Sequence, residues 1–208
     1  MIRLLFVVDG ERDAVTVPRL VERILTTQVA EETRPWARLH GAPKGYRSKL
    51  LFAMRQAQDS HSVGLVAVVD ADRDHEGRRL RAMREARDEE RTRSAVFPTA
   101  LGEAFPHGEA WLLDDPSAVR EALGLPADTA VPTVRHAKNP KKSLEELHAT
   151  SRRTGDRPVD VWADIARRLD PSRCAHAAET GFSQFAGEVR CEIGPVVTIA
   201  GRNTPGGR

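Results

Sequence analysis

The order of apolar runs in the first hundred residues is the feature that most constrains the fold of this chain. Two of these runs, IRLLFVVDG (2–10) and SVGLVAVVDAD (62–72), are rich in β-forming residues and end in acidic residues. Continuous apolar runs of this length are typical of strands that are buried on both faces of a parallel sheet. We expect two further strands at PWARLHG (35–41) and SAVFPTA (94–100).

Helical patterns lie between these strands. Residues 14–27 and 45–60 place apolar side chains three and four positions apart, and residues 76–94 form a highly charged helical stretch. We expect the first helix to begin near Thr16 and Pro18, which suit a cap and a first turn. The alternation of strand and helix predicts an α/β fold, with a mainly parallel, Rossmann-like sheet flanked by helices.

The pattern changes after about residue 112. We predict an α/β core over residues 1–115 and a helical C-terminal part over 116–195 that packs on it, in which Asn139 caps a helix. The last residues, 196–208, end in a polar stretch rich in glycine and proline, and we expect them to form a disordered tail.

Composition sets broad limits on the class of protein. The 208 residues include 40% hydrophobic and 30% charged residues with a net charge of +2, which is typical of a globular protein and does not indicate or exclude a local basic groove. Cys174 and Cys191 have no metal-binding spacing, so we expect free thiols in a reducing cytosol. The absence of a long apolar stretch or a signal-peptide pattern predicts a cytoplasmic protein without a membrane segment.

Acidic residues follow the two apolar strands. Alternate residues of an extended segment point the same way, so Asp70 and Asp72 should present both carboxylates to one side, with Glu11 facing them if the two strands are neighbours. Carboxylate oxygens are the ligands that Mg²⁺ and Mn²⁺ prefer, and a divalent cation would relieve the repulsion among them. The sequence predicts a Mg²⁺ or Mn²⁺ site at Glu11, Asp70 and Asp72, with Asp74 as a further ligand or only as a helix cap.

The ordered set of FVVDGERD (6–13) and VAVVDADRDHEG (66–77) resembles the Toprim domain of topoisomerases, primases and related nucleases. Two later segments, GEAWLLDDPSAV (108–119) and KNPKKSLEEL (138–147), resemble parts of small bacterial Toprim-like proteins of the DUF4276 type. Together these likenesses extend over most of residues 2–190.

The resemblance implies a Mg²⁺-dependent nuclease that cleaves phosphodiesters of DNA or RNA. Glu11 would be the general acid or base, or a shared ligand, and Asp70 and Asp72 would hold the metal. It also implies a setting in phage defence or DNA repair with an ATPase partner. Topoisomerases and primases have large extra domains for gripping DNA, and we expect none here, which favours nicking or cleavage over strand passage or primer synthesis.

Other charged residues are candidates for the same site. Glu109 matches the family segment and is a candidate catalytic acid, although an acid there could instead interact with a helix dipole. Lys44 and Lys49 follow the second expected strand, where a lysine could hold a phosphate, and Lys44 is a candidate catalytic residue. His107 is interpreted as a loop histidine.

Several cations are candidates for contact with nucleic acid. Besides Lys49, we select these: Arg73, Lys138, Lys141 and Lys142. A stripe of arginines on the charged helix could also follow a phosphate backbone, although neighbouring acids are typical of an ordinary solvated face; it comprises Arg78, Arg81, Arg84, Arg87 and Arg91.

Three alternatives to the nuclease remain open. The first is a non-catalytic Toprim-like binding or sensor subunit of an ATPase complex. The second is a receiver-like domain in which Asp70 accepts a phosphoryl group, although no lysine after a fifth strand is evident. The third is a nucleotide-sugar transferase with a metal-binding DxD motif, which would not explain Glu11. The oligomeric state also stays open, with a homodimer among the options.

Overall fold

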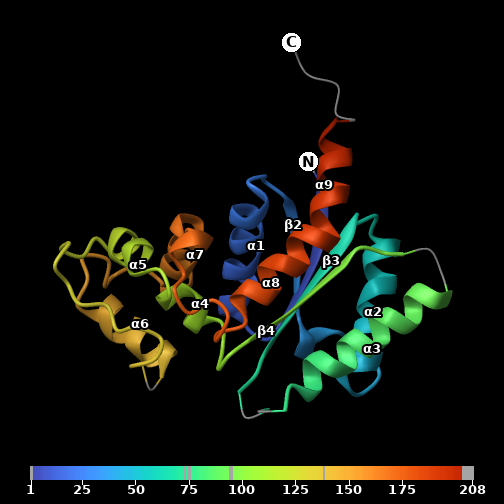
Figure 1. The fold of residues 1–208 in the computed structure, drawn as a ribbon, viewed down its shortest axis with the longest axis horizontal. Coiled ribbons are helices and arrows are strands. Elements are labelled where there is room, and N and C mark those ends of the chain that lie inside the picture. The colour runs from blue at the N-terminus through green and yellow to red at the C-terminus, as the bar shows by residue number, and fades with distance from the viewer. Residues whose placement is uncertain (1, 73, 75, 94–95, 138, 203–208) are drawn as a thin grey trace.

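Four parallel strands form the centre of the structure, and helices cover both faces (Figure 1). This computed structural model describes residues 2–72, 74, 76–93, 96–137 and 139–202. The strands are β1 (Arg3–Val8), β2 (Ala30–Pro35), β3 (Gly64–Asp70) and β4 (Thr99–Ala104). The α-helices are α1 (Glu11–Leu25), α2 (Tyr46–Asp59), α3 (Arg78–Arg93), α4 (Glu109–Leu113), α5 (Pro116–Leu123), α6 (Pro140–Ala149), α7 (Pro158–Arg168), α8 (Phe182–Glu188) and α9 (Gly194–Arg202). Three short helical turns complete the described structure: η1 (Trp36–Arg38), η2 (Pro171–Arg173) and the π-helical η3 (Val189–Ile193).

The sheet order is β2-β1-β3-β4, and every neighbouring pair is parallel. In the register, Val7 lies opposite Ala67, and Asp70 lies opposite Ala104. The carboxyl ends of β1, β3 and β4 therefore meet at one edge, which is where parallel α/β sheets bind ligands. The predicted α/β class, the parallel sheet and the helical C-terminal part are confirmed.

The strands are buried on both faces, as their continuous apolar sequences require. In β1, Leu4, Phe6 and Val8 pack toward α1 and the C-terminal helices, while Leu5 and Val7 pack toward α2 and α3. Burying a side chain of this size fully contributes about 1.5–3 kcal/mol. Each strand thus helps to stabilise two separate layers of helix.

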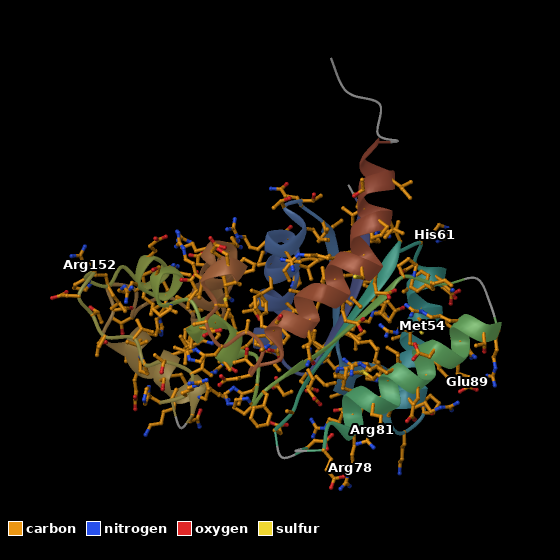
Figure 2. All side chains as sticks on the ribbon, in the orientation of Figure 1. Met54, His61, Arg78, Arg81, Glu89 and Arg152 are labelled. Atoms are coloured by element: carbon orange, nitrogen blue, oxygen red, sulfur yellow. The ribbon has the colours of Figure 1, made fainter. Side chains whose placement is uncertain are left out.

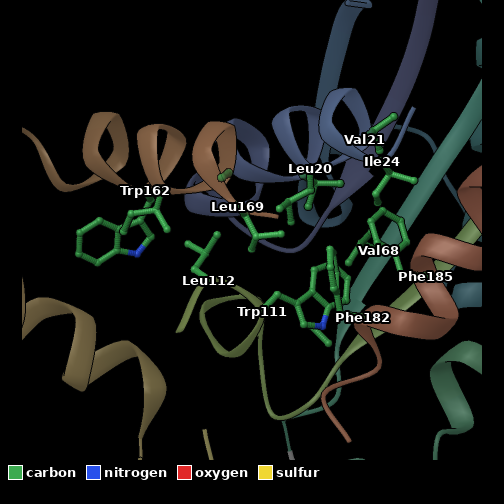
Figure 3. Packing of buried hydrophobic residues seen from close by; sticks show 14 of the residues in the cluster. Leu20, Val21, Ile24, Val68, Trp111, Leu112, Trp162, Leu169, Phe182 and Phe185 are labelled. Atoms are coloured by element: carbon green, nitrogen blue, oxygen red, sulfur yellow. The ribbon is translucent and has the colours of Figure 1, made fainter. Parts of the chain in front are cut away.

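The C-terminal helices extend the first of these cores. Trp111 of α4 stacks on Phe185 of α8 with ring centroids 4.9 Å apart, and Phe182 lies against the same indole (Figure 3). Trp162 of α7 belongs to the same apolar cluster as Leu20 of α1, on which α7 packs. One continuous core therefore spans the predicted boundary at residue 115, and the tryptophans in it are structural.

The second and fourth strands differ from their predicted positions. β2 is residues 30–35, and of the predicted segment PWARLHG only Pro35 belongs to it, since the turn η1 follows at Trp36. As an edge strand that is only partly buried, β2 has the sequence AEETRP and lacks the apolar run of a central strand. β4 begins at Thr99 and contains Gly102, where an added Cβ would lie 2.6 Å from the Phe185 ring. That glycine is needed for close packing of α8, and it weakens the strand pattern.

The start of the first helix and the end of the last helix also differ from the prediction. α1 begins at Glu11, well before Thr16 and Pro18, because Asp13 accepts a hydrogen bond from the Gly10 amide and caps the helix at that point. Residues 196–202, expected to be disordered, continue α9, in which Val197 is buried. Residues 203–208 lie outside the described part. In the part of the chain that the structure describes, no helix has the length and apolar character needed to cross a membrane.

Candidate functional site

A pocket of about 440 Å³ opens at the carboxyl edge of the sheet. It is bordered by six carboxylates, contributed by Asp9, Glu11, Asp13, Asp70, Asp72 and Glu109. Two cationic side chains, Arg12 and Lys141, and the imidazole of His107 also line it. The site therefore joins the ends of β1, β3 and β4 to α1 and to α6 of the helical C-terminal part.

Asp70 is the half-buried last residue of β3. A backbone amide of the loop after β4 holds its carboxylate in place. Its Oδ1 accepts a hydrogen bond of 3.0 Å from the amide of Gly108, and its own amide donates to Oδ2 of Asp9 at 2.6 Å. Burial and the nearby charges of Asp13 and Asp9 raise the pKa of Asp70 to about 8. These carboxylates repel one another, and the cations around them do not balance that repulsion.

Asp13 is a member of this cluster that the sequence analysis did not identify. It lies one turn into α1, is only 9% exposed, and accepts the Gly10 amide at 3.1 Å. Burial and the charge of Glu109 raise its pKa to about 7, and burial also raises the pKa of Asp9. The signal for Asp13 was its spacing from Gly10, which is the spacing of a capping residue and does not by itself indicate a buried site.

Asp72 and Asp74 play different parts. β3 ends at Asp70, and Asp72 has a φ of 44°, so strand alternation does not set the direction of its side chain. Asp72 still borders the pocket, with its carboxylate 3.4 Å from the Arg79 guanidinium. Asp74 does not border it and instead accepts the Arg79 amide at 2.9 Å, which lowers its pKa. Of its two predicted roles, the structure places Asp74 in the helix cap.

Glu11 does not face the aspartates from a strand end, contrary to the sequence prediction. It is the first residue of α1, its side chain is 79% exposed, and its carboxylate lies 3.5 Å from the Arg38 guanidinium. The capping of α1 at Gly10 starts the helix at Glu11 and directs this residue to the rim of the pocket.

Glu109 borders the pocket as predicted, but both of its carboxylate oxygens already have partners. Oε1 accepts from Arg12 at 2.9 Å, and Oε2 lies 3.0 Å from Nδ1 of His107. Burial by itself would raise the pKa of Glu109, but the contacts with His107 and Arg12 outweigh it and lower the pKa to about 2. Glu109 therefore stays ionised and holds Arg12 and His107 in position.

The predicted lysines are divided between the pocket and its surroundings. Lys141 at the start of α6 borders the pocket. Lys49 donates to the carbonyl of Trp36 at 3.1 Å. Burial raises the pKa of Asp9, and the charge of Lys49 partly offsets that rise. Lys44 is exposed before α2 and does not border the pocket, and Lys142 lies 3.6 Å from Glu146. Arg73 and Lys138 lie outside the described residues.

The arginine stripe of α3 is also divided. Figure 2 shows Arg78 and Arg81 at one end of α3, with Glu89 toward the other end. Arg87 is buried and bonds Glu188 of α8 and the carbonyl of Thr99, while Arg91 bonds Glu192. Arg87 and Arg91 are thus engaged by Glu188 and Glu192, while Arg78 and Arg81 are exposed.

The donor set of the pocket suits a hard divalent cation, although the ligands are not gathered into a finished cage. Among the described residues, no three His, Cys, Asp or Glu side chains are already arranged around a common metal position. Mg²⁺ usually keeps several waters and takes only one or two carboxylates, so Asp70 with Asp9 or Asp72 at the pocket would suffice.

Comparison of this chain with models of protein families, with curated proteins and with solved structures gives no match. The Toprim and DUF4276 resemblance therefore stays a prediction from the sequence.

Proposed function

We propose that this chain is a Mg²⁺- or Mn²⁺-dependent phosphodiesterase of the Toprim type that cleaves nucleic acid. One observation carries the proposal: Asp9, Asp13 and Asp70 form a partly buried acidic cluster at the carboxyl edge of a parallel sheet, in a pocket open to ligands. Such a cluster is unfavourable unless a cation or bound protons balance it. A bound divalent ion would stabilise the charge that develops on a phosphate during cleavage.

Different residues of the pocket would bind the metal and the phosphate. Asp70, fixed by the Gly108 amide, would hold the metal together with Asp9 or Asp72. Lys141 at the pocket and Lys49 beside it are the described lysines best placed to attract a phosphate. Arg78 and Arg81 could extend the contact along a nucleic-acid backbone. An ATPase partner is a prediction from the resemblance alone.

The test of this proposal uses the purified full chain with Mg²⁺ or Mn²⁺ and offers plasmid, single-stranded DNA and RNA in parallel. We expect cleavage of at least one of them, and a loss of at least about 100-fold in Asp70→Asn, because the variant retains the size of the side chain but removes its charge. Asp59→Asn is the matched control, since Asp59 is an exposed aspartate at the other end of α2 from the pocket edge.

A non-catalytic metal-binding subunit is the second candidate, and one observation favours it. The two acids predicted for catalysis are not free to exchange protons with a substrate in the pocket, because Glu11 is directed to the rim and Glu109 is bound to Arg12 and His107. Calorimetric titration with MnCl₂ separates the two candidates. Metal binding that depends on Asp70, without cleavage of any of the three substrates, would support the subunit and contradict the enzyme.

A further inference from the structure

Three side chains from two separate helices and a loop form a connected chain at the pocket. The guanidinium of Arg12 bonds Glu109 at 2.9 Å and Glu145 at 2.7 Å, and it lies over the Trp162 ring at 5.7 Å. Arg12 is thus held by Glu109, Glu145 and Trp162, and it fixes the position of the Glu109 carboxylate. On its other oxygen, Glu109 contacts His107.

The imidazole of His107 is oriented by this chain. Its Nδ1 atom is buried and lies 3.0 Å from Oε2 of Glu109, although the ring is not aligned for a linear hydrogen bond. Hydrogen bonds of catalytic groups are often poorly aligned without substrate and tighten when it binds. With Nδ1 turned to Glu109, Nε2 is the ring nitrogen that remains for a ligand in the pocket.

The backbone of the same loop is hydrogen-bonded to the predicted metal ligands. Gly108, the next residue, donates its amide to Asp70 at 3.0 Å. On the other side, the carbonyl of Pro106 accepts the amide of Asp72 at 2.9 Å, and the Phe105 amide donates to Thr180. The loop backbone that carries His107 is therefore hydrogen-bonded to both aspartates of the DxD motif.

We propose that His107 is the general acid of the pocket, and that Glu109 and Arg12 are positioning residues that act through it. This inference rests on the proposed phosphodiesterase function. The oxygen of an attacking water would form a new bond to phosphorus, and the bond from phosphorus to the leaving oxygen would break. The leaving oxygen keeps the electron pair and receives the proton from Nε2 of His107. The water releases its own proton to solvent, and solvent then reprotonates the imidazole.

Replacing the leaving oxygen provides a direct test of this role. A thiolate is a much better leaving group than an alkoxide and does not need a proton, so a substrate with sulfur at that bridging position does not require a general acid. We would compare an oligonucleotide of the type that wild type cleaves with the same oligonucleotide containing this sulfur, made for both bridging positions. The readout is the ratio of single-turnover rates for the two substrates.

We expect His107→Ala to slow cleavage of the oxygen substrate by about 10²–10⁴-fold and that of the sulfur substrate by less than about tenfold. Glu109→Gln should show a smaller loss, about tenfold, that is again confined to the oxygen substrate. A purely structural role would lower both rates together. His107→Asn serves as a second variant if the alanine form is unstable, and far-ultraviolet circular dichroism checks each fold.

His61→Asn is the matched control, because His61 is exposed at the end of the molecule far from the pocket edge (Figure 2). Its φ is 59°, which asparagine tolerates. Equal slowing of both substrates by His107→Ala, or no slowing, would overturn the assignment of His107 and leave the proposed function intact. If wild type cleaves neither substrate with Mg²⁺ or Mn²⁺, the proposed function fails, and the role of His107 fails with it.

Discussion

At the scale of single residues, Gly108 shows how tightly the acidic pocket is built. Its φ of −54° and ψ of −30° are open to any residue, so its lack of a side chain has a steric cause. A Cβ there would lie 2.6 Å from Oδ1 of Asp13. The same residue donates its backbone amide to Asp70, so the carboxylates of Asp13 and Asp70 both lie against the loop after β4.

We predict that Gly108→Ala lowers the free energy of unfolding by about 1–3 kcal/mol, because Asp13 must rotate away and lose its bond to the Gly10 amide. Urea titration followed by circular dichroism measures this change. In an Asp13→Ala background the obstacle is gone, so the same substitution should have almost no effect. Equal destabilisation in both backgrounds would contradict the steric explanation.

At the scale of elements, α8 is held against the sheet by its ends. Gly181 precedes it with a φ of 80°, and a Cβ at this position would collide with the carbonyl oxygen of Glu103 in β4. At the other end, Glu188 bonds Arg87 of α3 beside the edge of β4. The helix thus connects β4 with α3 through contacts between residues that are far apart in the sequence.

Two glycines of this region should respond in opposite directions to alanine. Gly181→Ala should reduce stability by at least about 2 kcal/mol, because it combines a left-handed backbone with a clash against a strand. Gly187→Ala should raise stability by up to about 1 kcal/mol, because Gly187 lies within α8 with open space at its Cβ. Thermal unfolding of both variants checks this, and a loss of stability in Gly187→Ala would be the contrary result.

The buried and exposed arginines of α3 should differ in their effect on stability. Arg87→Ala should lower the free energy of unfolding by about 3 kcal/mol, since it leaves Glu188 and the Thr99 carbonyl without their partner in a largely buried setting. Arg81→Ala, on the exposed side of the same helix, should stay within about 0.5 kcal/mol. Chemical denaturation of the two variants distinguishes these roles, and equal values would mean that the stripe is not divided.

At the scale of the whole molecule, the acidic pocket is where the α/β core and the helical C-terminal part meet. Arg12 of α1 contacts α4, α6 and α7 through Glu109, Glu145 and Trp162. Asp13 and Asp70 retain protons in the fold at pH values where a free aspartic acid has lost them. The charge state of the pocket is therefore linked to the stability of the entire fold.

In EDTA, we predict that the melting temperature falls as pH rises from about 5 to about 8. The folded pKa values of Asp13 and Asp70, about 7 and about 8, lie above those of the unfolded chain. The native state then binds more protons than the unfolded state, so stability decreases with pH over this window and levels off above it. Differential scanning calorimetry at a series of pH values measures the slope.

Asp70→Asn should reduce this slope, because the variant retains only the contribution of Asp13. Mg²⁺ should raise the melting temperature of wild type more at pH 8 than at pH 6, since protons compete with the metal for the same carboxylates. The linkage would be wrong if stability rose with pH in EDTA, or if Asp70→Asn showed the slope of wild type.

The sequence by itself determined the features that depend on neighbouring residues. The apolar runs of β1 and β3 predict strands buried on both faces, because only central parallel strands need no polar side. Asn139 and Asp74 cap their helices as local hydrogen bonding requires. The position of Asp70 at a strand end, and hence at the ligand-binding edge, follows from the same local pattern.

The tertiary structure alone decided which acids gather at that edge. The edge strand β2 and the Gly102-containing β4 have weak local patterns, because packing against other elements replaces the apolar side chains that would reveal them. Asp13 becomes part of the pocket only when α1 begins at Glu11 and the loop of Gly108 folds beside it. The partners of Glu109 come from Arg12, far away in the sequence, and from His107 beside it. Burial and charge depend on contacts between distant segments, so no local pattern could assign the pocket its pKa values or His107 its orientation.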